Sequence, residues 1–213
     1  MRVDPYRITA RTYDPVIGSL TRSMRRKRRR IAPPRRGMHV LDIGCGTGAD
    51  LQPYLSAGCR VSGVDRSRSM LRTARRRLGS EADLHLCNAT RLPFPDGSFD
   101  LVLASLTLHE IPPEDREAVI GEMRRVIRVE GRILLTDYLP RCLRLPQGWF
   151  SALIIYILER TAGPQHYTNG REFLRNGGLR GLVHRSALRV EKRSIAGAGN
   201  IALYLLSSDR SRL

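Results

Sequence analysis

The stretch Val40-Leu41-Asp42-Ile43-Gly44-Cys45-Gly46-Thr47-Gly48 decides the fold. Its apolar first half predicts a buried strand, and glycines at alternate positions predict a turn where the backbone can approach a ligand without Cβ clashes. A helix is expected to follow over residues 47–55. A strand, a glycine turn and a helix in this order are typical of the first unit of a doubly wound sheet.

Outward from this stretch, short apolar runs alternate with amphipathic segments, as in parallel βαβ units. Strands are predicted over residues 38–43, 60–65, 83–87, 99–106 and 132–137. Helices are predicted over 67–78, capped by Ser67, over 113–127, and over 168–175, ended by Gly177-Gly178. Two strand-like segments follow, near 180–193 and 200–207. The sequence therefore predicts a Rossmann-like, doubly wound α/β sheet, mostly parallel, with a C-terminal antiparallel hairpin.

Chain length and composition limit the other possibilities. A chain of 213 residues fits one such domain, preceded by a basic helical leader over residues 1–37 that Pro33-Pro34 would stop. The sequence has no apolar run of membrane-spanning length and no secretory signal, so we expect a cytoplasmic protein. Its four cysteines are scattered without metal-ligand spacing, so we expect no metal site and reduced thiols.

The net charge of +17 indicates attraction to polyanions such as nucleic acid, an anionic membrane surface or acidic proteins. All but two of the 37 basic residues are arginines, so genome composition is an equally good explanation. Residues 25–30 are six consecutive basic residues, which would surround a helix on all sides. This pattern favours a flexible or anion-docked segment over an amphipathic helix face.

Two carboxylates near the glycine turn indicate which kind of ligand it binds. Asp65 ends the second predicted strand about 20 residues after Gly44, where an acidic side chain reaches a pair of ribose hydroxyls. Asp42 stands beside the turn and would repel a pyrophosphate but accept from an amino group. The pattern indicates a nucleoside ligand, although Asp42, Asp65 and Asn88 are each also suited to capping a loop or a helix.

Three segments resemble class I S-adenosylmethionine-dependent methyltransferases: the quoted glycine stretch, Gly-Val-Asp ending at Asp65, and Asn88-Ala89-Thr90 followed by Leu92-Pro93-Phe94. The resemblance covers about residues 38–137. It is greatest to quinone-biosynthesis C-methyltransferases and small phospholipid N-methyltransferases.

The resemblance implies a set of cofactor contacts. Asp42 and the backbone of Gly44 and Gly46 would hold the methionine part of S-adenosylmethionine, and Asp65 the ribose. Arg66 would border the adenine, and Ser105 would lie beneath the cofactor. The other positions expected at the cofactor are Ala89, Asn88 and Cys45, which lies within the loop and has no chemical role for its thiol. The family usually has Asp where this chain has Asn88, and an amide oxygen can still accept from the adenine amino group.

Candidates for the residues that contact the methyl acceptor lie after the fourth and fifth predicted strands. His109 is the first candidate for a general base, with His166 and Tyr138 as second choices, and each of them is equally readable as a residue bonded to backbone. Tyr6 and Tyr13 are candidates for closing over the cofactor. Residues 142–178 are expected to cap the acceptor pocket, and their apolar run 149–158 fits a core helix, a lid or a membrane-surface contact.

We therefore expect an enzyme that transfers a methyl group to a small or lipid-like acceptor, such as a quinone precursor or a phospholipid amine, and releases S-adenosylhomocysteine. An anionic membrane surface is one expected partner, at the inner face of the membrane, and nucleic acid is less favoured because few aromatic residues accompany the arginines. Two alternatives stay open: an RNA- or polyanion-binding protein on a methyltransferase scaffold, and a dinucleotide-dependent oxidoreductase.

Overall fold

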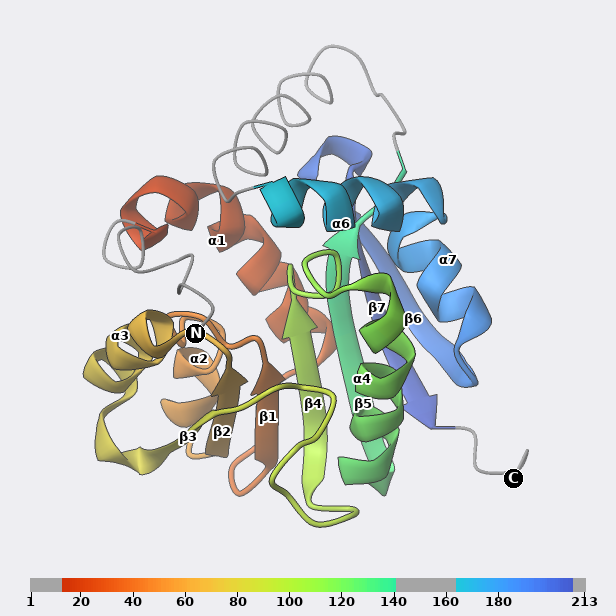
Figure 1. Cartoon of the computed structure of the whole chain (residues 1–213). Coiled ribbons are helices and arrows are strands. Elements are labelled where there is room, and N and C mark those ends of the chain that lie inside the picture. Colours follow the sequence, from red (N-terminus) through yellow and green to blue (C-terminus); the bar gives the residue numbers. More distant parts are fainter. Residues whose placement is uncertain (1–12, 141–163, 209–213) are drawn as a thin grey trace.

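The computed structural model describes residues 13–140 and 164–208, which form one seven-stranded sheet with helices on both faces (Figure 1). The strand order is β3-β2-β1-β4-β5-β7-β6. Strands β1 to β5 pair in parallel, and β7 pairs antiparallel with both β5 and β6. The strands are β1 His39–Ile43, β2 Arg60–Asp65, β3 Ala82–Leu86, β4 Phe99–Ser105, β5 Ile127–Tyr138, β6 Leu188–Ala196 and β7 Ile201–Ser208.

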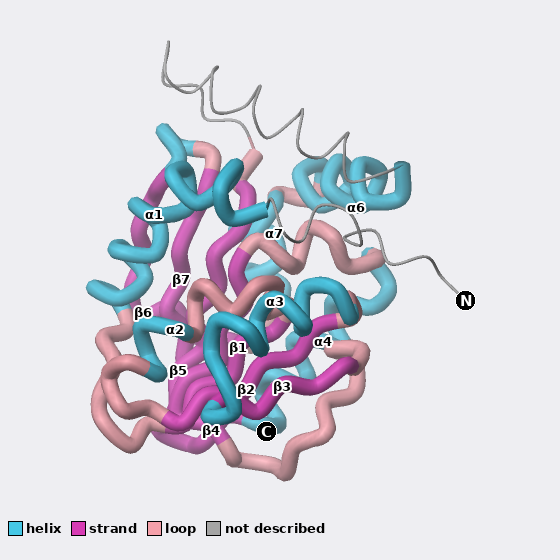
Figure 2. The backbone as a smooth tube through the Cα atoms, turned by 90° about the vertical axis from the view of Figure 1, so that its left-hand side faces the viewer, coloured by secondary structure: helices cyan, strands magenta, loops and turns pink. Residues whose placement is uncertain are grey.

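The helices bury two separate sets of apolar side chains against the two faces of the sheet. They are α1 Tyr13–Ile31, α2 Gln52–Leu55, α3 Arg68–Leu78, α4 Pro113–Val126, α6 Pro164–Arg175 and α7 Gly178–Arg185. Tyr54 of α2 and Leu71 of α3 belong to one core, and Met123 of α4 and Leu182 of α7 belong to the other. Figure 2 shows α2 on one side of the sheet and α4 and α7 on the other.

The predicted mixed sheet, parallel except for a C-terminal hairpin, is confirmed. The strand order changes direction at β1, which lies between β2 and β4. Ligands of open α/β sheets bind beyond the carboxyl ends of the strands at such a point. Ser67 caps α3 as predicted, because its Oγ accepts from the Met70 amide at 3.1 Å.

Two segments differ from the prediction. Only Gln52–Leu55 of the helix expected over 47–55 is α-helical, and the chain before it forms turns. The strand expected over 180–193 begins only at Leu188, because α7 precedes it. Gly177 adopts a left-handed conformation, with a φ of 89°, and α7 then packs Leu179, Leu182 and Val183 into the core at helical spacing.

The basic run 25–30 is not a flexible segment, because it forms the end of α1 and packs on the domain. Arg28 is 5% exposed and ion-pairs with Asp50. The Lys27 Nζ donates to the Ile195 carbonyl at 2.5 Å. The basic residues of α1 that are exposed to solvent are Arg22, Arg26, Arg29 and Arg30.

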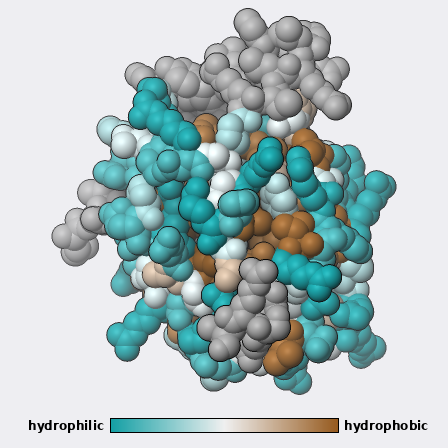
Figure 3. All heavy atoms as spheres, turned by 90° about the vertical axis from the view of Figure 1, so that its right-hand side faces the viewer, coloured by the Kyte–Doolittle hydropathy of each residue, from teal (hydrophilic) through white to brown (hydrophobic). Residues whose placement is uncertain are grey.

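Strand β6 forms one edge of the sheet, and charged side chains protect this edge from pairing with other chains. Its exposed residues include Arg189, Glu191, Lys192 and Arg193. Hydrophilic side chains cover most of the molecular face seen from this side, around a smaller apolar area (Figure 3).

Within residues 13–140 and 164–208, no helix combines the length and the apolar character needed to cross a membrane. Several sequence predictions fall outside these ranges, namely those on Tyr6, Cys142, the apolar run 149–158 and most of the expected cap over 142–178. The side chain of Tyr13 is likewise not described.

Candidate functional site

In the glycine turn after β1, the first two glycines are needed for different physical reasons. Both have positive φ values, +68° at Gly44 and +52° at Gly46, which side chains rarely adopt. A Cβ on Gly44 would lie 2.4 Å from the Cγ2 of Thr107, so this glycine lets the loop after β4 pack closely. Among the described residues, a Cβ on Gly46 would meet nothing within 4 Å, so the backbone at Gly46 borders open space in this part of the chain.

Asp65 joins the glycine turn to the start of α3. One carboxylate oxygen accepts from the Gly46 amide at 2.8 Å, and the other accepts from the Ser67 amide at 2.8 Å. Burial raises the pKa of Asp65 to about 6, although both amide hydrogen bonds oppose this shift. The side chain is only half-buried, and a carboxylate has lone pairs for further donors. Asp65 can therefore shape the turn and still accept from ribose hydroxyls.

Asp42 is a buried carboxylate at the centre of the sheet's carboxyl edge. Its side chain is 1% exposed, and among the described residues its Oδ1 has no hydrogen-bond partner. Burial, and then the negative charge of Asp50, raise the pKa of Asp42 well above its ordinary value. Such a group is costly unless a donor meets it. The turn and these two carboxylates fit S-adenosylmethionine, whose amino group and ribose hydroxyls are donors.

The other expected cofactor residues lie at the carboxyl ends of neighbouring strands. Arg66 and Asn88 are exposed after β2 and β3, Ala89 is half-buried, and Ser105 ends β4 half-buried. Asn88 also makes the turn foreseen as its alternative, because its Oδ1 accepts from the Thr90 amide at 3.3 Å. The Cys45 thiol instead faces the core, 2.8 Å from where a Cβ on Gly63 would stand.

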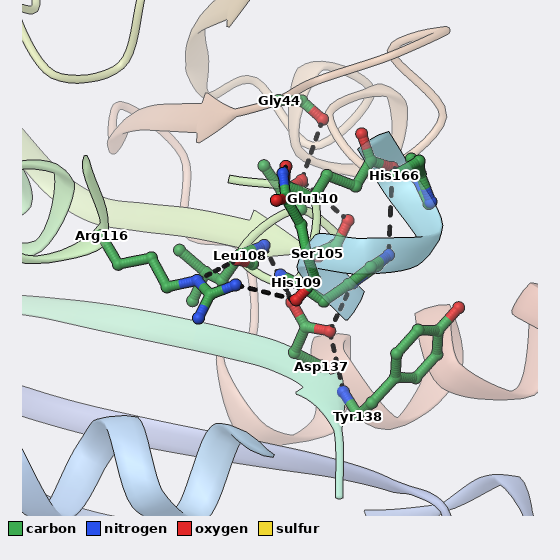
Figure 4. A network of polar contacts seen from close by, with 11 residues as sticks. Gly44, Ser105, Leu108, His109, Glu110, Arg116, Asp137, Tyr138 and His166 are labelled. Atoms are coloured by element: carbon green, nitrogen blue, oxygen red, sulfur yellow. Dashed lines mark hydrogen bonds and ion pairs between the residues drawn. The ribbon is translucent and has the colours of Figure 1, made fainter. Parts of the chain in front are cut away.

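The expected acceptor residues come together beside this turn, around a pair formed by His109 and Asp137 (Figure 4). The Nδ1 of His109 lies 2.7 Å from Oδ1 of Asp137. The carboxylate of Asp137 also accepts from the backbone amides of Leu108, His109 and Tyr138, at 2.9, 3.3 and 2.8 Å. The Asp137 side chain accepts from these donors, so an N–H on Nδ1 of His109 fits the 2.7 Å contact, and this tautomer of the neutral ring has its lone pair on Nε2.

Glu110 lies between the two candidate histidines. Its Oε1 is 3.0 Å from Nε2 of His166 and 4.0 Å from Nε2 of His109. The ring centre of His109 lies 5.5 Å from that of His166 and 4.3 Å from that of Tyr138. One ligand atom each of His109, Glu110 and His166 could also hold a metal ion. In the structure, however, the Glu110 carboxylate pairs with His166. The arrangement can accept and pass on a proton.

Sequence reasoning did not select Asp137 or Glu110 as site residues. Asp137 was predicted only as the end of a strand, and Glu110 was expected beside His109 at the rim of the pocket without a role of its own. A signal for Asp137 existed, because it stands at the carboxyl end of β5, in the same position that makes Asp42 and Asp65 candidates on β1 and β2. No signal could have paired Glu110 in the loop after β4 with His166, which is far away in the sequence, on α6.

Comparisons with known proteins agree with this geometry. A family model described as "Methyltransferase domain" matches residues 40–131. A demethylmenaquinone methyltransferase of Beutenbergia cavernae is 32% identical over 215 residues, which cover 92% of this chain and 85% of that protein. A phosphatidylethanolamine N-methyltransferase of Cereibacter sphaeroides is 36% identical over 61% of this chain and 64% of its own length.

A crystal structure of a SAM-dependent methyltransferase from Aquifex aeolicus has the same fold, with a TM-score of 0.57 at 18% identity over 86% of this chain and 89% of that one. The chain spans about half the length of the curated relatives that it matches first. The match to the Beutenbergia protein, in contrast, extends over most of both chains. The chain belongs to the class I S-adenosylmethionine-dependent methyltransferases.

Proposed function

We propose that this chain transfers the methyl group of S-adenosylmethionine to a small or lipid-like acceptor. The observation that carries the proposal is the pair of carboxylates Asp42 and Asp65 at the carboxyl ends of β1 and β2, on either side of a glycine turn. Bound S-adenosylmethionine supplies a methyl group on a positively charged sulfur. In this proposal Asp65 accepts from the ribose hydroxyls and Asp42 from the amino group, while Gly46 lets the backbone come close.

On the acceptor side, His109 would take the proton that leaves the acceptor atom as it attacks the methyl group. Asp137 holds the ring so that Nε2 is the accepting nitrogen, and it stabilises the positive charge that the ring gains. Glu110 lies 4.0 Å from Nε2 and pairs with His166, so these two residues would offer the proton a way out of the buried ring. Tyr138 would pack against the same ring and limit where an acceptor can lie.

Two acceptor classes follow from the relatives' names, a demethylated quinone and a phospholipid amine. In the proposal, α1 and residues 142–178 belong to the acceptor side. The exposed arginines of α1, Arg22, Arg26, Arg29 and Arg30, would then attract an anionic membrane surface that carries a lipid-like acceptor. This attraction should weaken at high salt, because exposed charges are screened.

An acceptor screen tests the proposal. The full chain is incubated with S-adenosylmethionine labelled in its methyl group and with demethylmenaquinone, or with vesicles of phosphatidylethanolamine and phosphatidylglycerol. We expect label in one of these products with wild type and none with Asp42→Asn. Stabilisation by NAD(H) but not by S-adenosylmethionine would instead support an oxidoreductase. Tight, salt-sensitive RNA binding without methyl transfer would support a polyanion-binding protein.

A further inference from the structure

Arg116 of α4 is a buried arginine outside the catalytic groups discussed so far. Its side chain is 5% exposed. Its Nε donates to the carbonyl of Leu108 at 3.2 Å and to that of Ile111 at 3.0 Å. These two carbonyls flank His109 and Glu110 in the loop after β4. One nitrogen of Arg116 therefore holds both ends of the short loop that carries the candidate base.

The other two nitrogens of Arg116 reach α6. One donates to the carbonyl of Asn169 at 3.0 Å, and the other ion-pairs with Glu172. The guanidinium carbon lies 5.0 Å from the centre of the Phe173 ring, which is 2% exposed. Arg116 thus joins three elements through one planar group: α4, the loop after β4 and α6.

A second contact ties the same two elements directly. The side-chain amide of Asn169 donates to the carbonyl of Glu110 at 2.7 Å. Asn169 is 4% exposed and is held in turn by Arg116 through its own carbonyl. His166 lies one turn earlier on α6, with its Nε2 3.0 Å from Glu110. The distance between Glu110 and His166 therefore depends on how α6 is fixed to the loop.

A buried guanidinium is a costly way to fill space, because it must be desolvated and every donor must find an acceptor. An apolar side chain of similar size would pack there at lower cost. What the guanidinium adds is a rigid fork that fixes several acceptors relative to one another. Here the fixed acceptors belong to the loop with His109 and Glu110 and to the helix with His166.

We propose that Arg116 is a positioning residue that sets the placement of Glu110 and His166 next to the His109 ring. This inference rests on the proposed methyl transfer for its catalytic meaning, whereas the positioning can be measured without turnover. Arg125, also on α4, supplies a matched control. Its guanidinium binds the carbonyls of Phe94 and Leu92 at 2.7 and 3.1 Å and pairs with Asp96 and Glu122, away from this cluster.

The experiment compares wild type, Arg116→Met, Arg116→Lys and Arg125→Met as full chains. Spectra of protein labelled with ¹⁵N-histidine report the side chains of His109 and His166, and calorimetry measures the affinity for S-adenosylhomocysteine. We expect Arg116→Met to shift or broaden both histidine signals while the affinity changes by less than about twofold, because the cofactor contacts lie on other elements. Arg116→Lys should restore the signals in part, since it keeps a donor but not the fork.

With an acceptor that wild type methylates in the screen, Arg116→Met should lower kcat by at least about tenfold without changing the KM for S-adenosylmethionine. Arg125→Met should leave the histidine signals and kcat as in wild type, even if both variants unfold at a lower temperature. Unchanged histidine signals in a folded Arg116→Met would overturn the inference. If no acceptor is found, the proposed function is in doubt, but the spectra still decide the role of Arg116.

Discussion

The Nδ1 of His109 lies 2.7 Å from Oδ1 of Asp137, and the two side chains are only 2% and 0% exposed. Asp137 is satisfied by three backbone amides besides this ring. A carboxylate so placed keeps the ring in one tautomer and supports a positive charge on it. The pair therefore has the geometry of a general base with its orienting acid.

Replacing the base should affect catalysis and leave cofactor binding intact. We expect His109→Gln to lower kcat by about 10² to 10⁴, the usual contribution of a positioned general base. Its affinity for S-adenosylhomocysteine, measured by calorimetry, should stay as in wild type. His184 is exposed on α7, so His184→Gln is the control. Full activity of His109→Gln would mean that the acceptor loses its proton without this ring.

The close contact between Gly44 and Thr107 predicts an unequal cost for two glycine substitutions. Gly44→Ala would combine a strained φ of +68° with a Cβ 2.4 Å from Thr107. Gly97 has a φ of +61°, and a Cβ on it would meet no described residue within 4 Å. We expect Gly97→Ala to lower the free energy of unfolding by about 1 kcal/mol, and Gly44→Ala by about 3 kcal/mol or more. Urea denaturation measures both. Equal losses would show that strain alone matters at Gly44.

When no cofactor is bound, the buried Asp42 carboxylate should lower the free energy of unfolding at neutral and alkaline pH. Its folded pKa is raised by burial, so its contribution to stability is present below the unfolded pKa near 4 and is lost as pH rises through the folded pKa. We expect Asp42→Asn to melt above wild type at pH 8, by about 2–4 °C for each kcal/mol recovered, with a smaller difference at pH 4. The variant should bind S-adenosylhomocysteine more weakly. A lower melting temperature at pH 8 would contradict this reading, and Asp83→Asn on exposed β3 is the control.

Cofactor binding should release protons and weaken in acid. The pKa of Asp65 is about 6 because of burial, and a ligand that donates hydrogen bonds favours the ionised carboxylate. Affinity should therefore fall below about pH 6, by up to about tenfold per pH unit. Calorimetry at pH 6 in two buffers of different ionisation enthalpy should show net proton release. Proton uptake would mean that the carboxyl binds in its neutral form.

The sheet was predictable because its signals are local. Alternation of apolar runs with turns located the five parallel strands, and the final strands gave the hairpin, since each pattern follows from a side-chain period of two and a short connection. The glycine turn, Asp42 and Asp65 were found in the same way, from their order along a few strand ends. Their placement in one edge of the sheet then follows from the parallel topology.

The errors and omissions involve contacts between distant segments. Residues 180–185 read as a strand by composition, but a left-handed Gly177 allows α7 to start and pack on the sheet. The run 25–30 was predicted to be flexible or anion-docked, because nothing in the neighbouring sequence shows that Arg28 pairs with Asp50. The pairing of Glu110 with His166 and the role of Arg116 likewise depend on where α6 lies, which no local pattern specifies.

The most direct test of the account is the binding of S-adenosylhomocysteine by calorimetry at pH 8, with wild type, Asp65→Ala and the control Asp83→Ala. Charge-assisted hydrogen bonds to two ribose hydroxyls contribute about 1.5–3 kcal/mol each, so Asp65→Ala should bind at least about 100-fold more weakly. Asp83→Ala should bind as wild type does. Wild-type protein that gives no binding heat, or Asp65→Ala that binds as tightly as wild type, would contradict the account.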